Sequence, residues 1–222
     1  MRCNLRCVYC QNAEISQLSF GREVSGEELA AMMLALQARG CHNINLVSPT
    51  HVIPQILEAV YLAARDGLSL PLVYNTGGYD SLEMLALLEG VVDIYMPDMK
   101  YGDAEAARKY SLVKDYVRVN QAAVLAMHRQ VGDLQVDAQG IAVRGLLVRH
   151  LVLPNGLAGS ERVLRFLAEK VSKNSYVNIM AQYHPAFRAE DFSELNRRIT
   201  AQEYQEAIQL ARALGLTRLD KV

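Results

Sequence analysis

The 222-residue chain lacks the features that would connect it with nucleic acids or membranes. Its formal net charge is −1, and acidic and basic residues are interspersed, so no strongly basic surface is expected to bind a nucleic acid or an anionic membrane. No apolar run reaches the length of a membrane-spanning helix, and the first residues do not resemble a secretory signal peptide. These absences predict a cytoplasmic protein that binds neither nucleic acid nor membrane.

Cysteine is also scarce, and three of the four cysteines are close together: Cys3, Cys7 and Cys10. Such clustering is typical of metal ligands in a reducing compartment and not of a disulfide framework. The run C-x3-C-x2-C has no fourth cysteine nearby. A closed structural metal site needs four protein ligands, and each iron of a cubane cluster is normally capped by a thiolate. Three thiolates would leave one iron open to a molecule that is not protein.

Cys41 is the remaining candidate for a fourth ligand. It precedes a predicted strand at 43–47, which places it at the N-terminal edge of the sheet. The cysteine segment is expected at the opposite edge, and a strand of five to seven residues spans roughly 15–20 Å. We therefore interpret Cys41 as a small core or surface thiol.

Strand-like and helix-like segments alternate along the rest of the chain. Helices are predicted over 25–39, 53–66, 80–89, 161–171 and 200–214, and 104–129 is predicted to be mostly helical with a break near Ser111. Strands are predicted over 43–47, 70–74, 91–96, 146–153 and 176–180, with a small hairpin at 134–143. The alternation predicts an α/β fold with a parallel sheet and covering helices, in a single domain spanning 1–222.

Polar side chains follow the predicted strands at their carboxyl ends, and two more interrupt the apolar strand at 146–153, where a charge is costly unless it is paired. In a parallel sheet these ends share one edge, where β/α folds bind ligands. Each turn taken alone is explained equally well by ordinary turn chemistry. Together they predict one large polar site, with the candidates Ser48, Thr50, Asn75, Thr76, Asp98, Lys100, Arg149, His150 and His184.

The cysteine motif, with Tyr9 before its last cysteine, resembles the radical S-adenosylmethionine superfamily. The segments 11–12, 48–51, 75–79, 95–101, 149–154 and 180–185 resemble one branch, the pyruvate formate-lyase activating enzyme-related proteins. The resemblance implies a partial (β/α)6 TIM-like barrel. Its first strand is missing here, because only two residues precede Cys3, so the domain is expected to be truncated at that strand.

The resemblance also implies an activity. Cys3, Cys7 and Cys10 would be the catalytic and metal-binding residues, which ligate a [4Fe–4S] cluster whose open iron binds S-adenosylmethionine (SAM). One-electron reduction would split SAM into methionine and a 5′-deoxyadenosyl radical, which in glycyl-radical activases removes a hydrogen atom from a glycine of a partner enzyme. The implied partners are a glycyl-radical enzyme and an electron donor of the flavodoxin or ferredoxin type.

The same resemblance implies which residues contact SAM. Ser48 and Thr50 stand where relatives place a Gly-Gly-Glu-Pro turn that binds the methionyl amine, and the glutamate of that turn is absent here. The implied cofactor-binding residues are Tyr9, Ser48, Thr50, Asn75, Thr76, Asp98, Lys100, Arg149, Leu153 and His184.

Two alternatives from other classes stay open. A non-catalytic iron–sulfur or metal-binding protein would need a fourth ligand and would not need Asn75, Asp98 or His184. An inactive fragment would keep the fold without the activity. Reductive cleavage of SAM to 5′-deoxyadenosine distinguishes both alternatives from a radical SAM enzyme.

Overall fold

The computed structural model describes residues 3–18 and 20–220. Its strands are β1 (Ile44–Val47), β2 (Leu72–Thr76), β3 (Ile94–Pro97), β4 (Gln135–Val136), β5 (Ala142–Leu151) and β6 (Tyr176–Met180). Its α-helices are α1 (Ala13–Ser16), α2 (Gly26–Ala38), α3 (Ile53–Arg65), α4 (Leu82–Leu87), α5 (Ala104–Ser111), α6 (Tyr116–Val131), α7 (Ser160–Phe166) and α8 (Ala201–Ala213). Short helical turns are η1 (Pro49–His51), η2 (Pro154–Gly156), η3 (Leu167–Val171) and η4 (Ala189–Asp191).

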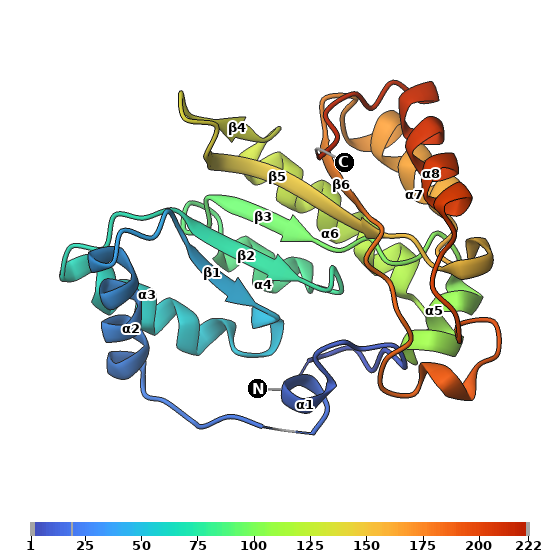
Figure 1. Cartoon of the computed structure of the whole chain (residues 1–222). Helices are drawn as coiled ribbons and strands as arrows, with labels where there is room; N and C mark the ends of the chain where they lie inside the picture. Colours follow the sequence, from blue (N-terminus) through green and yellow to red (C-terminus); the bar gives the residue numbers. More distant parts are fainter. Residues whose placement is uncertain (1–2, 19, 221–222) are drawn as a thin grey trace.

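The sheet is mostly parallel, with the order β1-β2-β3-β5-β6, and β4 pairs antiparallel with the first part of β5. Its register pairs Val47 with Asn75 and Thr76 with Pro97, and a bridge joins Asp98 to Arg149. The carboxyl ends of neighbouring strands therefore meet at one edge. Figure 1 shows the N-terminal segment with α1 beyond the arrowheads at this edge. The predicted α/β class is confirmed.

Local sequence signals explain where two of the long helices begin. The Glu28 N–H donates to Ser25 Oγ at 3.1 Å, and the Glu28 carboxylate accepts from the Ser25 N–H at 2.9 Å. Thr200 and Glu203 form the same reciprocal pair before α8. Both pairs satisfy backbone N–H groups that have no partner within the helix. The predicted break in 104–129 is also confirmed, because α5 ends at Ser111 and α6 begins at Tyr116.

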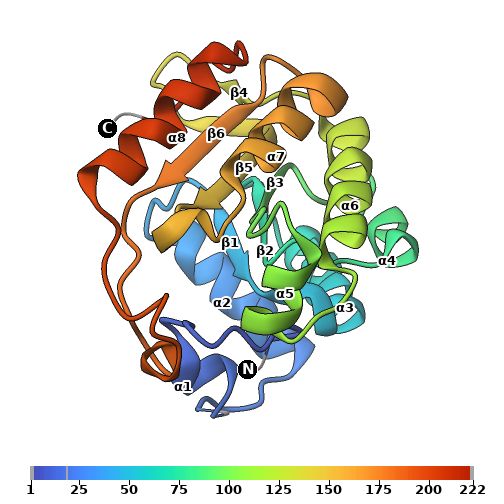
Figure 2. The ribbon, with the colours of Figure 1, turned by 90° about the vertical axis from the view of Figure 1, so that its right-hand side faces the viewer.

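The main core lies between the sheet and the helices α4, α6, α7 and α8. Tyr74 and Tyr95 from the strands pack with Leu85, Met127 and Leu164 from these helices, and all five are buried. Burying such side chains contributes about 1.5–3 kcal/mol each. Figure 2 shows α6, α7 and α8 beside one another on the outer side of β5 and β6. No helix among residues 3–18 and 20–220 is long and apolar enough to span a membrane.

The predicted hairpin differs from the observed structure at its second strand. Segments 141–143 and 146–153 were expected to be separate strands, but they form the single strand β5. Gly145 allows this continuity, because its φ of +116° is rarely adopted by residues with a side chain. A Cβ at this position would lie 2.4 Å from the Asp133 carbonyl oxygen, so the close passage of that backbone also requires glycine.

Candidate active site

The cysteine segment is held by long-range backbone hydrogen bonds. The Val8 N–H donates to the Tyr110 carbonyl at 2.8 Å, and the Arg188 N–H donates to the Val8 carbonyl at 2.8 Å. Tyr9 is buried, and its hydroxyl donates to the hydroxyl of Tyr101 at 2.7 Å. The first strand among the described residues, β1, comes after this segment. Tertiary contacts with the end of α5 and with the segment around Arg188 therefore fix the position of the cysteines.

A cavity of about 350 Å³ lies between the cysteine segment and the carboxyl edge of the sheet. It brings together most of the predicted site residues: Cys3, Cys7, Tyr9, Cys10, Ser48, Asn75, Thr76, Asp98, Lys100 and Arg149. Sequence reasoning assigned no role to the other lining residues: Leu5, Gln11, Asn12, Ser16, Gln17, Val47, Gly77, Leu151, Met180 and Gln182. Six of them lie inside the segments that resemble the family, and this resemblance was the available signal: Gln11, Asn12, Gly77, Leu151, Met180 and Gln182.

Each of the three thiols has a hydrogen-bonding neighbour. The Ser111 hydroxyl donates to Cys7 Sγ at 2.9 Å. Cys10 Sγ lies 3.1 Å from the Ser16 hydroxyl, and the Leu5 N–H donates to Cys3 Sγ at 3.5 Å. Hydrogen bonds to cysteine sulfur are one of the means by which proteins tune iron–sulfur clusters.

Cys7 is the most buried of these cysteines. Burial raises the pKa of its thiol to about 11, and the opposing effects of the Lys100 ammonium and the Ser111 hydrogen bond are smaller. A buried thiolate without a partner is therefore unfavourable at neutral pH. Iron coordination supplies the positive charge that such a thiolate needs.

Three charged side chains form the polar wall of the cavity. Lys100 Nζ donates to Asp98 Oδ2 at 2.5 Å, and Arg149 Nη1 lies 3.5 Å from Asp98 Oδ1. Burial disfavours the Lys100 ammonium, but the Asp98 carboxylate and Cys7 together outweigh burial and raise the pKa of Lys100. Arg149 also donates to Asn75 Oδ1 at 3.2 Å. With two cations and one carboxylate, this wall is suited to an anionic group of a ligand.

Asp98 has a further property that bears on ligand binding. Its Oδ1 atom is buried and forms no hydrogen bond in the described part of the chain, where its contact is the ion pair with Arg149 at 3.5 Å. Buried polar atoms in native proteins are usually hydrogen-bonded, so Asp98 Oδ1 keeps an unused acceptor position beside Arg149.

Asp80 supports the wall of the cavity from behind through Thr76, and the sequence did not mark it for this role. Its buried carboxylate accepts hydrogen bonds from Thr50 Oγ1 at 2.7 Å, Thr76 Oγ1 at 2.8 Å and the Tyr74 hydroxyl at 2.9 Å. The Thr76 hydroxyl in turn accepts from the Gly78 N–H at 3.1 Å. This network fixes the turn after β2. In the sequence, Asp80 resembles an ordinary residue at the start of a helix, so no local signal marks it as buried.

Replacing Asp80 with asparagine is expected to change the pH dependence of stability. Burial raises the pKa of Asp80 despite its three hydrogen bonds. The favourable contribution of Asp80 is therefore fully present below the ordinary aspartate pKa of about 4, and is lost as the pH rises through the folded-state pKa. Urea unfolding across this range should show the advantage of the wild type over Asp80→Asn shrinking as the pH rises. A difference between the two proteins that is independent of pH would contradict this prediction.

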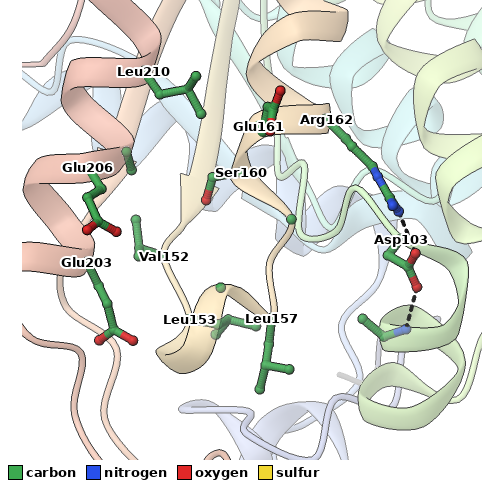
Figure 3. A pocket seen from close by; sticks show the side chains of 14 residues that line it. Asp103, Val152, Leu153, Leu157, Ser160, Glu161, Arg162, Glu203, Glu206 and Leu210 are labelled. Carbon is green, nitrogen blue, oxygen red and sulfur yellow. Dashed lines mark hydrogen bonds and ion pairs between the residues drawn. The ribbon is translucent and has the colours of Figure 1, made fainter.

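Three predicted cofactor contacts do not line the cavity. Thr50 is directed to Asp80, as described above. His184 lies near the rim, where its Nδ1 is 3.2 Å from Gln11 Nε2. Leu153 is buried and lines a different hollow, of about 520 Å³, between η2, α7 and α8 (Figure 3). The roles of these three residues toward SAM stay predictions.

Arg149 and His150 are adjacent in β5 but have different surroundings. Arg149 lines the cavity, whereas His150 is buried with its Nδ1 2.7 Å from the Met99 carbonyl oxygen. Because a carbonyl only accepts, Nδ1 carries the proton, and Nε2 accepts from Ser160 Oγ at 2.9 Å. Burial lowers the pKa of His150, which keeps the ring neutral. Ser160 faces the second hollow, which Glu203 and Glu206 of α8 line on the other side (Figure 3).

The donor set fits an iron–sulfur cluster better than a single metal ion. Among residues 3–18 and 20–220, no three His, Cys, Asp or Glu side chains are arranged to hold one ion. A cubane does not require such convergence, because each thiolate caps a different iron. Cys41 precedes β1, at the other end of that strand from Ser48, and does not line the cavity. Three thiols beside a charged wall thus fit a cluster with a polar ligand next to it.

Comparisons with known proteins agree with this arrangement. The family model of the radical SAM superfamily matches residues 1–143. An uncharacterized protein of Methanocaldococcus jannaschii is 30% identical over 96% of this chain and 61% of its own length. A radical SAM methyltransferase from Sphaerobacter thermophilus superposes with a TM-score of 0.68 at 16% identity, over 99% of this chain and 62% of that one. The chain thus spans about three-fifths of the length of both proteins.

A third comparison concerns the predicted branch. A domain of pyruvate-formate lyase-activating enzyme from Bacteroides vulgatus superposes with a TM-score of 0.56 at 11% identity, over 80% of this chain and 97% of that one. Such low identity shows a shared fold and does not assign the branch. The family model, in contrast, covers more than half of the chain, and its match includes the three cysteines. The chain therefore belongs to the radical SAM superfamily, whose members use a [4Fe–4S] cluster and S-adenosylmethionine.

Proposed function

We propose that this chain binds a [4Fe–4S] cluster through Cys3, Cys7 and Cys10 and catalyses the reductive cleavage of SAM. The observation that carries the proposal is that these thiols open into the same cavity as Asp98 and Lys100. When bound, the cluster supplies one electron to the sulfonium of SAM, which yields methionine and a 5′-deoxyadenosyl radical. The cofactor provides this reactivity, and the protein provides binding, orientation and exclusion of water.

The residues of the cavity have distinct tasks in this proposal. Lys100 and Arg149 bind the carboxylate of SAM, and Asp98 holds both cations in place through its contacts at 2.5 and 3.5 Å. Asp98 Oδ1, which is ion-paired with Arg149 but not hydrogen-bonded, accepts a hydrogen bond from a hydroxyl or an ammonium of the ligand. Leu5 and Leu151 provide apolar walls that exclude water from the reacting atoms.

The proposed radical acceptor is a glycine of a partner glycyl-radical enzyme, from which the 5′-deoxyadenosyl radical removes a Cα hydrogen atom. Support comes from the resemblance of six short segments to the activating-enzyme-related branch. An electron donor of the flavodoxin or ferredoxin type completes the proposed system. Free thiols at the cluster site fit a reducing compartment, such as the cytoplasm.

Anaerobic reconstitution with iron and sulfide, followed by SAM and dithionite, is expected to produce 5′-deoxyadenosine and methionine in equal amounts. Chromatography of the products measures both compounds. Addition of the glycyl-radical enzyme is then expected to give its glycyl signal in electron paramagnetic resonance. Full iron loading without 5′-deoxyadenosine would contradict the proposed cleavage and support a non-catalytic iron–sulfur protein. Cleavage of SAM without a glycyl signal would contradict only the acceptor.

A further inference from the structure

A hollow of about 500 Å³ lies on the outer side of the cysteine segment. Its walls combine two arginines, Arg6 and Arg188, with three exposed apolar side chains, Leu18, Leu112 and Phe187. No aspartate or glutamate lines it in the part of the chain that the structure describes. The hollow is therefore apolar with a positively charged border, which is a typical composition for a protein-binding surface.

Cys3 connects this outer hollow with the cavity of the active site. Of the three cluster-binding cysteines, Cys3 alone lines both spaces, and Ser16 and Gln17 form the rest of the shared wall. Electron transfer between proteins slows steeply as the distance between redox centres grows. A donor seated in the outer hollow would approach the cluster through the single layer of residues that contains Cys3.

Two of the apolar residues have unusual backbone conformations. Leu112 has a φ of +57° and is 61% exposed, and Phe187 has a φ of +54° and is 42% exposed. Left-handed conformations cost bulky residues on the order of 1–3 kcal/mol and are concentrated at functional sites. Both residues adjoin the hydrogen bonds that hold the cysteine segment, from Arg6 N–H to Ser111 O and from Arg188 N–H to Val8 O. The fold thus presents two strained, exposed apolar side chains on either side of the cysteines.

We propose that this hollow is the docking surface for a small acidic electron-donor protein, an inference that rests on the proposed function. Arg6 is exposed and forms no ion pair with the described residues, and Arg188 pairs with Asp191 at 2.9 Å in an exposed contact. Both guanidinium groups can face carboxylates of a partner. One electron passes from the donor to the cluster, so the donor is oxidised by one electron and the cluster is reduced by one. Electron-transfer complexes of this kind are small and are steered by charge.

Two variants of the full chain test the surface, with a flavodoxin as the probe. Arg6→Glu is expected to weaken flavodoxin binding about tenfold at low salt, with a smaller difference at high salt. Leu112→Asn is expected to slow cluster reduction by reduced flavodoxin while the free energy of unfolding is unchanged or higher, because asparagine adopts the left-handed conformation readily. Arg39→Glu, an exposed charge reversal just after α2, is the matched control and should change neither measurement.

Titration of the oxidised proteins measures affinity, and stopped-flow spectroscopy measures cluster reduction. Dithionite bypasses docking, so both variants should form 5′-deoxyadenosine with dithionite at the wild-type rate. Wild-type affinity in Arg6→Glu together with a wild-type rate of cluster reduction in Leu112→Asn would overturn the docking proposal, and so would no binding of flavodoxin to the wild-type chain. Dithionite turnover would leave the proposed function intact in both cases. The docking proposal would also be overturned if the variants bound flavodoxin normally but lost self-association or affinity for a glycyl-radical enzyme. Absence of 5′-deoxyadenosine with dithionite in the wild type would overturn the proposed function. The titration with flavodoxin would still test the docking surface, because it does not depend on SAM cleavage.

Discussion

A Cys7→Ala variant is expected to lose its iron–sulfur cluster and all cleavage of SAM. Wild-type chain should reconstitute with about four irons, as a cubane requires, and show the broad visible absorption of a [4Fe–4S] cluster. Cys7 is buried at the wall of the cavity, and in its absence only Cys3 and Cys10 remain as ligands. The fold should survive, since the substitution removes only one hydrogen bond, from Ser111, and a small side chain. Iron analysis and absorption spectra measure the loss, and circular dichroism checks the fold.

Cys41→Ala is the matched control for this experiment. Cys41 is also a free cysteine, but it precedes β1 and does not line the cavity. Its removal should leave iron content and SAM cleavage unchanged. Loss of iron in Cys41→Ala, with retention in Cys7→Ala, would contradict the ligand assignment and favour a site that includes Cys41.

Replacing Asp98 with asparagine is expected to have the largest effect on stability among substitutions at the charged wall. The change removes the one carboxylate that contacts both Lys100 and Arg149, and the Asp98 and Lys100 side chains are only 16% and 17% exposed. Breaking a largely buried ion pair costs about 3–5 kcal/mol, because the remaining charge stays desolvated. We therefore expect the free energy of unfolding to fall by about 3 kcal/mol. Urea denaturation of the apo-protein at neutral pH measures the change without involving the cluster.

The pH dependence of the stability difference between the wild type and Asp98→Asn follows from the ion pair between Asp98 and Lys100. The raised pKa of Lys100 means that its ion pair stabilises the fold fully below the ordinary lysine pKa of about 10.4, and the contribution is lost only as the pH rises through the folded-state pKa. The pair is thus complete throughout the neutral range. Glu105→Gln breaks an exposed pair with Arg108 and serves as control, with little effect expected. Equal losses of stability in the two variants would contradict a special role for Asp98.

Much of the fold was accessible from local patterns. Capping boxes at Ser25 and Thr200, the break after Ser111 and the alternation of strands and helices depend on residues close in the chain. The separation of 141–143 from the following strand was wrong, because Gly145 resembles a turn residue in the sequence. In the structure, the backbone of Asp133 lies in contact with Gly145, and tertiary packing brings the two together.

The candidate site was predictable to the extent that strand ends determine it. Asn75, Thr76, Asp98 and Lys100 reach the cavity because the ends of parallel strands share an edge. Thr50 belongs to a similar turn, yet its hydroxyl is directed to the buried carboxylate of Asp80. No local pattern distinguishes a hydroxyl that faces a ligand from one that supports the turn beneath it.

The sequence by itself determined the number and spacing of the clustered cysteines, the α/β class and the edge of the sheet where polar residues gather. These properties follow from covalent order and from the side-chain periods of strands and helices. Tertiary structure alone decided that Tyr110 and Arg188 hold the cysteine segment, that Asp98 joins two cations, and that Cys3 borders both the cavity and the outer hollow. Each of these contacts joins residues far apart in the chain, so it forms only when the packed core brings their elements together.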